Sequence, residues 1–130
     1  MMRQLPWRGV LEEICRLWLP ARRRHPLPAF LDERFDAWPF TDAAIAVAPT
    51  SPGVYLLYAC SRLIYIGLAV SGSGIRQELA SHLSGARGEC TQRASAFLYE
   101  LDDVPLALHR SYLHAHSERY GGRLPPCNAA

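Results

Sequence analysis

Lysine is absent from the sequence, and all fourteen basic residues are arginine. A coding sequence rich in G and C is the simplest explanation of this bias. A guanidinium also matches a phosphate better than an ammonium does, so the composition is compatible with contact to a phosphate backbone. The formal net charge is only +2, which excludes a protein that attracts polyanions through its overall charge alone.

Long apolar runs are also missing. No segment approaches the ~20 consecutive apolar residues that a membrane-spanning helix needs. Residues 1–8 lack the apolar core and small residues of a signal peptide. We therefore expect a cytoplasmic protein with no membrane partner.

The cysteines form no Cys-x-x-Cys pair, which gives no support to a structural zinc site. They are Cys15, Cys60, Cys90 and Cys127. Because no export signal is present, we expect free thiols rather than a disulfide framework. A hydrophobic content of 49% and a charged content of 20% are typical of a globular protein.

Two amphipathic helices are predicted before residue 50. Residues 5–19 carry apolar side chains at helical spacing, and Pro20 ends this helix. Pro28 can begin a second helix. Its expected buried stripe comprises Phe30, Leu31, Phe35 and Trp38. Residues 43–48 fit either a helix or a strand, and the Pro- and Gly-containing stretch 49–53 then marks a boundary. We divide the chain into a helical extension, residues 1–49, and a second unit, residues 50–130.

The pattern changes from residue 53 onward. Two runs rich in aliphatic and aromatic residues, 54–59 and 63–66, flank a short turn and predict an antiparallel hairpin. A loop is expected over 67–74, followed by a helix over 75–83 with Ser73 as its cap. A polar loop over 84–93 leads to a strand over 94–101. The last elements are a helix over 104–117, capped by Asp102 or Asp103, and an extended tail. The predicted fold class is α+β, with one small three-stranded antiparallel sheet flanked by helices and two extra N-terminal helices.

Two triplets lie on the strands of the predicted hairpin, Gly53-Val54-Tyr55 and Tyr65-Ile66-Gly67, with nine residues between them. This pair resembles the GIY-YIG nuclease family, which includes homing endonucleases, some restriction enzymes and the incision subunit of bacterial excision repair. The spacing on one hairpin makes the pair far more specific than either triplet alone. The resemblance covers residues 50–128 and implies a GIY-YIG-type fold in an endonuclease-like protein that acts on nucleic acid.

The resemblance also implies four catalytic residues: Tyr55, Tyr65, His82 and Asn128. The asparagine ends a Pro-x-x-Asn tail that begins at Pro125, and in the family it supports the site by hydrogen bonding. Hairpin geometry sets a condition for the two tyrosines. A two-residue turn at Ser61-Arg62 would place Tyr65 opposite Tyr58, on the other face from Tyr55, whereas a three-residue turn over residues 60–62 or a bulge places both phenols on one face.

Two positions depart from the family pattern. The helix after the second triplet usually carries, four residues before the histidine, an arginine that binds the scissile phosphate; Glu78 stands there instead. The family's metal ligand is a glutamate on the next helix, and His109 takes its place. A lone imidazole is a poor magnesium ligand, because magnesium prefers oxygen donors. The resemblance still implies a divalent metal ion, Mg or Mn, as the cofactor.

Two interpretations of this altered site are open. Glu78, His82 and His109 offer one carboxylate and two imidazoles, a set suited to zinc, manganese or iron. Alternatively, Glu78 and His82 form a surface pair while His109 is a histidine at the edge of the core. We favour the second interpretation.

The expected partner is nucleic acid, with DNA as the expected form. Arg76, Arg87 and Arg93 are the candidate phosphate-binding residues around the cleft. Arg76 lies two residues before Glu78, ~200° around a helix, so it does not replace the missing arginine. Two functions follow from the sequence: a metal-dependent phosphodiesterase with a rearranged site, or a non-catalytic nucleic-acid-binding or protein-interaction module that keeps the fold.

Overall fold

We describe residues 37–129 of the protein from a computed structural model. The elements in chain order are β1 (Trp38–Pro39), α2 (Asp42–Ala46), β2 (Gly53–Ala59), β3 (Arg62–Ala69), α3 (Gly74–Leu83), α4 (Glu89–Gln92), β4 (Ala96–Leu101) and α5 (Pro105–Arg119). The helix predicted over residues 5–19, and the second predicted helix up to residue 36, lie outside the described residues. In residues 37–129, no helix has the length and apolar character needed to cross a membrane.

The sheet has four antiparallel strands in the order β1-β4-β2-β3. The α+β class is confirmed, but the predicted count of three strands is wrong because β1 adds a fourth. Trp38, expected on the buried face of a helix, pairs instead with Phe97 of β4 and is 46% exposed. Pro39 follows it, and a proline inside a helix would remove a hydrogen bond and clash with the preceding turn.

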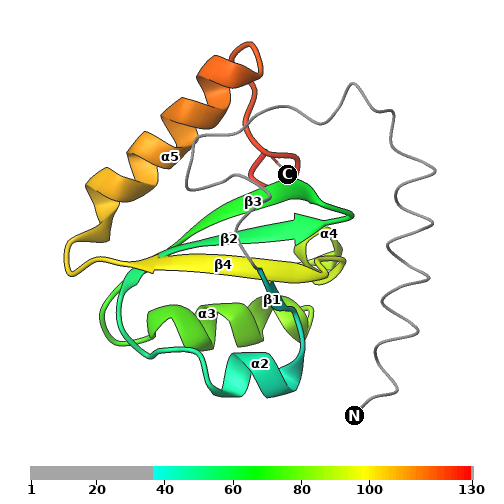
Figure 1. Cartoon of the computed structure of the whole chain (residues 1–130), viewed down its shortest axis with the longest axis vertical. Coiled ribbons are helices and arrows are strands. Elements are labelled where there is room, and N and C mark those ends of the chain that lie inside the picture. Colours follow the sequence, from blue (N-terminus) through cyan, green and yellow to red (C-terminus); the bar gives the residue numbers. More distant parts are fainter. Residues whose placement is uncertain (1–36, 130) are drawn as a thin grey trace.

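Helices cover both faces of the sheet (Figure 1). Helix α5 lies on one face, over a buried cluster of Val54, Leu56, Tyr58, Leu63, Ile66 and Tyr112. Helices α2 and α3 lie on the other face, over a larger cluster that includes Phe40, Ile45, Tyr55, Leu57, Ile75, Leu79 and Phe97. Phe40 and Ile45 precede the predicted boundary at residue 50, yet they pack into the same core as the hairpin.

The β2–β3 hairpin meets the condition for a shared tyrosine face through a bulge. Cys60 and Ser61 form a two-residue turn, and both have positive φ angles of 57° and 63°. Along the strands, Leu57 pairs with Tyr65 whereas Tyr58 pairs with Leu63, so one extra residue of β3 is accommodated between the two pairs. This shift moves Tyr65 onto the face that carries Tyr55.

The predicted free thiols are wrong. Cys90 of α4 and Cys127 of the tail form a disulfide with a Cα–Cα distance of 5.6 Å, and Cys60 is also disulfide-bonded. Cys90 and Cys127 are 37 residues apart, and only the tertiary fold brings them together. Their spacing in the sequence therefore gave no indication of the bond.

Smaller predictions also change. Helix α4 lies inside the stretch predicted as a loop. Ser73 is at the start of α3, but its side chain makes no capping hydrogen bond. The predicted cap of α5 is also wrong: Asp102 Oδ1 accepts at 2.9 Å from the N–H of Val104, which precedes the helix, and α5 begins without a side-chain capping hydrogen bond. The tail is turned rather than extended, since the N–H of Asn128 donates to the carbonyl of Pro125 at 3.0 Å.

Candidate functional site

Tyr55 is placed by the cross-strand pair that joins the two triplets. It lies directly opposite Gly67, and its side chain is fully buried. A Cβ atom built on Gly67 would collide with the Tyr55 ring. The glycine of the second triplet therefore leaves the space that the tyrosine of the first triplet occupies.

The Tyr55 hydroxyl contacts two side chains from α3, one helical turn apart. It lies 3.1 Å from Glu78 Oε1 and 2.7 Å from His82 Nε2. The other ring nitrogen of His82 lies 2.7 Å from the Thr91 hydroxyl of α4. All three contacts are satisfied together when Thr91 donates to Nδ1, Nε2–H donates to the tyrosine oxygen, and Tyr55 donates to the carboxylate. An ionised Glu78 thus selects one tautomer of His82.

Tyr65 completes an aromatic cluster at the opening of this site. Its ring centroid is 4.9 Å from that of His82 and 6.0 Å from that of Tyr55. Tyr65 is partly exposed, whereas Tyr55 and His82 are buried. A ligand that approaches from solvent would therefore meet Tyr65 before Tyr55.

The loop between α3 and α4 contributes a guanidinium to the site. Arg87 Nη2 donates to Glu78 Oε1 at 2.5 Å, so one carboxylate oxygen accepts from both Arg87 and Tyr55. The Arg87 side chain is 40% exposed and that of Glu78 is 13% exposed. From the sequence, Arg87 is expected near the cleft, but its pairing with Glu78 is not. The nine-residue separation with glycines at 85 and 88 was the available signal, because such a loop can fold back on its helix.

Burial controls the protonation of the inner residues. It is the largest cause of the raised pKa of Tyr55, and neighbouring Tyr65 and Glu78 raise that pKa further. Burial, followed by the charge of Arg87, lowers the pKa of His82 from 6.5 to about 4. Both groups are therefore uncharged at neutral pH. His82 is only 1% exposed, so the interpretation of Glu78 and His82 as a surface pair is wrong.

Asn128 and His109 meet at the backbone of β3 instead of joining the Tyr55 cluster. Asn128 Oδ1 accepts from the N–H of Ile66 at 2.8 Å, and its Nδ2 donates to the carbonyl of the same residue at 3.0 Å. His109 Nε2 lies 3.2 Å from that carbonyl, which fixes the proton on this nitrogen. Ile66 lies between Tyr65 and Gly67, so these contacts hold the strand that carries the second triplet.

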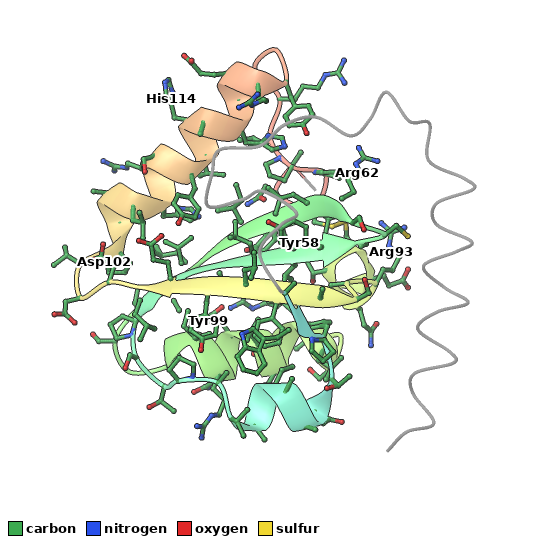
Figure 2. The ribbon with its side chains drawn as sticks, viewed as in Figure 1. Tyr58, Arg62, Arg93, Tyr99, Asp102 and His114 are labelled. Atoms are coloured by element: carbon green, nitrogen blue, oxygen red, sulfur yellow. A yellow bond between two sulfur atoms is a disulfide. The ribbon has the colours of Figure 1, made fainter. Side chains whose placement is uncertain are left out.

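The other two predicted phosphate-binding arginines are exposed and lie around α3 and α4. Arg76 Nε donates to the carbonyl of Ala48 at 2.8 Å, consistent with its expected position away from Glu78. Arg93 donates to the carbonyl of Cys90 at 3.5 Å and lies at the α4 end of the sheet (Figure 2).

The three predicted metal ligands do not gather. Glu78 and His82 share the Tyr55 hydroxyl, while His109 is hydrogen-bonded to the backbone of Ile66. Across residues 37–129, no group of three or more His, Cys, Asp or Glu side chains could hold a metal ion.

The arrangement therefore presents one guanidinium beside two phenols and an imidazole, with the guanidinium and the Tyr55 hydroxyl both donating to Glu78. Comparisons of the chain with family models, curated proteins and solved structures give no match.

Proposed function

We propose that this chain is a GIY-YIG endonuclease-like protein that binds nucleic acid through the face formed by α3, α4 and the hairpin. The observation that carries the proposal is the convergence of Tyr55, Tyr65 and His82 on one side of the sheet. The two triplets meet as a cross-strand pair, which supports a shared role for their tyrosines.

The donor set does not fit the magnesium ion that the family resemblance implies. The Glu78 carboxylate is engaged by Arg87 and Tyr55, and both nitrogens of His82 are hydrogen-bonded. His109 offers nitrogen where magnesium prefers oxygen. We therefore propose binding as the principal activity and derive no metal-assisted step.

Strand scission should accordingly be slow or undetectable in the wild-type chain. Tyr55 keeps its proton at neutral pH and is sealed from solvent, so it can orient a phosphate oxygen or a water only after the site opens. Losing one electrostatic contact to the transition state commonly lowers the rate by about 10²–10³.

The exposed arginines support nucleic acid as the partner. Arg76, Arg87 and Arg93 place three positive charges around α3 and α4, and DNA is the form that we propose. Binding to duplex DNA should weaken with salt, and each phosphate contact should contribute about −0.9 to the slope of log affinity against log salt. Anisotropy of a labelled duplex, measured over a salt series, tests this. Binding that ignores salt, or that is absent at low salt, would remove nucleic acid as the partner.

A plasmid-nicking assay separates the binding module from an enzyme, the second candidate. The informative variant is Tyr55→Phe. The matched control is Tyr99→Phe, because Tyr99 lies directly opposite Tyr55 on β4 and on the α3 side of the sheet (Figure 2). Nicking with magnesium, manganese or zinc that Tyr55→Phe loses and Tyr99→Phe keeps would establish catalysis and overturn the binding-only proposal.

The disulfide weighs against the cytoplasmic location expected from the sequence, because thiols in that compartment stay reduced. We propose that the folded domain works in an oxidising environment. Alkylation in intact cells followed by mass spectrometry is the check: free thiols at Cys90 and Cys127 would contradict this.

A further inference from the structure

The Glu78–Arg87 ion pair closes the buried part of the site. Glu78 Oε1 accepts from Arg87 at 2.5 Å and from the Tyr55 hydroxyl at 3.1 Å. The guanidinium is the outermost of the three groups, since Arg87 is 40% exposed, Glu78 is 13% exposed and Tyr55 is buried. Anything that reaches Tyr55 from this side must first displace the pair.

The closed site carries no net charge. Glu78 and Arg87 cancel, and burial keeps the Tyr55 hydroxyl and the His82 ring uncharged at neutral pH. Such a site offers little electrostatic attraction to a phosphate, because the carboxylate offsets the charge of Arg87. The attraction appears only if Arg87 leaves Glu78.

A phosphate can replace the carboxylate on Arg87 because each offers two acceptor oxygens that the guanidinium fork can bind. Only Nη2 of Arg87 is hydrogen-bonded to Glu78, and the side chain reaches the surface. An ion pair of this exposure is weak, commonly equivalent to less than a tenfold change in an equilibrium. Exchange of one anion for another at Arg87 is therefore feasible.

We propose that Arg87 is the phosphate-binding group of this site, in place of the arginine missing from α3, and that Glu78 is an internal anion that competes with the backbone phosphate of the nucleic acid. This inference rests on the proposed function. Glu78 stands where the family pattern has an arginine, and Arg87 supplies the guanidinium from the loop that follows α3. When a phosphate binds, it replaces the Glu78 carboxylate as the acceptor for the Arg87 guanidinium.

The test measures the affinity of the full chain for a labelled DNA duplex at one low salt concentration, by fluorescence anisotropy. Glu78→Gln is the informative variant, because its side-chain oxygen can still accept from Tyr55 while the charge is gone. Glu89→Gln is the control, since it removes the same charge from an exposed position at the start of α4. Arg87→Gln and the double variant Glu78→Gln with Arg87→Gln complete a cycle.

We expect Glu78→Gln to bind up to about tenfold more tightly than wild type, because the anion that competes with phosphate for Arg87 is removed. Glu89→Gln should change the affinity much less. Arg87→Gln should weaken binding, and the double variant should match Arg87→Gln, because Glu78 acts only through Arg87. Thermal unfolding of each variant checks that the fold is kept.

Three outcomes overturn the inference. Equal gains in Glu78→Gln and Glu89→Gln would reduce the effect to net charge and leave the proposed function intact. A gain in Glu78→Gln that persists without Arg87 would show that the carboxylate acts through another group. A chain that binds no nucleic acid in any variant would remove both the inference and the proposed function.

If Glu78→Gln does not fold, titration of the wild-type chain with dimethyl phosphate replaces it. A shift of the Arg87 side-chain NMR signal that saturates is then required, and an unchanged signal refutes the exchange.

Discussion

His82 should make the protein less stable in mild acid. Its pKa is lowered from 6.5 to about 4, first by burial and then by Arg87. Between these two values the unfolded chain binds a proton that the folded chain does not, so acidification favours unfolding. The contribution of His82 to the free energy of unfolding is unchanged above about pH 6.5 and decreases as the pH falls toward about 4.

The magnitude follows from the pKa difference. Each pKa unit corresponds to about 1.4 kcal/mol, so the full loss is about 3 kcal/mol and the loss by about pH 5 is about 2 kcal/mol. The charged and titratable groups around the ring are Tyr55, Tyr65, Glu78 and Arg87, with the Thr91 hydroxyl on Nδ1. Protonation of Nδ1 would also break the hydrogen bond that Thr91 donates.

Urea unfolding over a pH series provides the assay, with wild type compared with His82→Gln. The variant is less stable at neutral pH, but its free energy of unfolding should fall less steeply with acid than that of wild type. His114→Gln is the control, because His114 is exposed on α5 beside Glu118 and should leave the slope unchanged (Figure 2). His116 also has a lowered pKa and contributes the same sign in every variant, so only the difference from wild type is informative. Equal slopes in wild type and His82→Gln would refute the reasoning.

Two further predictions concern the tail. Asn128→Ala removes both hydrogen bonds to Ile66 and should lower the free energy of unfolding by about 1–3 kcal/mol. Asn128→Asp keeps the acceptor for the Ile66 N–H but turns a carboxylate oxygen, which cannot donate, toward the Ile66 carbonyl, so it should recover little of that loss. Urea titration measures both variants, and wild-type stability in either would contradict the account. Reduction of the Cys90–Cys127 disulfide, which closes a loop of 37 residues, should cost roughly 4 kcal/mol through chain entropy. Cys90→Ser lacks this bond, so its urea midpoint should shift less on addition of reductant than that of wild type, and a wild-type chain indifferent to reductant would exclude this stabilisation.

The central hairpin could be predicted from the sequence because its information is local. Residues 53–59 and 62–69 are rich in the aliphatic and aromatic side chains that strands favour, and a short turn separates the two runs. The shared face of Tyr55 and Tyr65 was predicted only as a condition, since the sequence left the turn length open. The structure meets the condition with a bulge, a feature that no local pattern encoded.

The missed features all depend on contacts between distant parts of the chain. Strand β1 has two residues, too few to show alternation, and exists only because β4 accepts it. The partners of the Cys90–Cys127 disulfide and of the Glu78–Arg87 ion pair likewise come together only in the folded chain, so their spacing in the sequence does not reveal them. Asn128 was predicted in the site through the family resemblance, but its contacts are to the backbone of Ile66 and not to the Tyr55 cluster.

The side-chain amide of Asn128 has a consequence for association between molecules. Strand β3 lies at one margin of the sheet, where free N–H and C=O groups could recruit a strand from another chain. The side chain of Asn128 is hydrogen-bonded to both the N–H and the C=O of Ile66, and the N–H of Cys127 donates to the carbonyl of Ile64 at 2.8 Å. At the opposite margin of the described sheet, β1 is two residues long and one of them, Pro39, has no N–H to offer. Both margins therefore discourage the strand-by-strand growth that leads to aggregation.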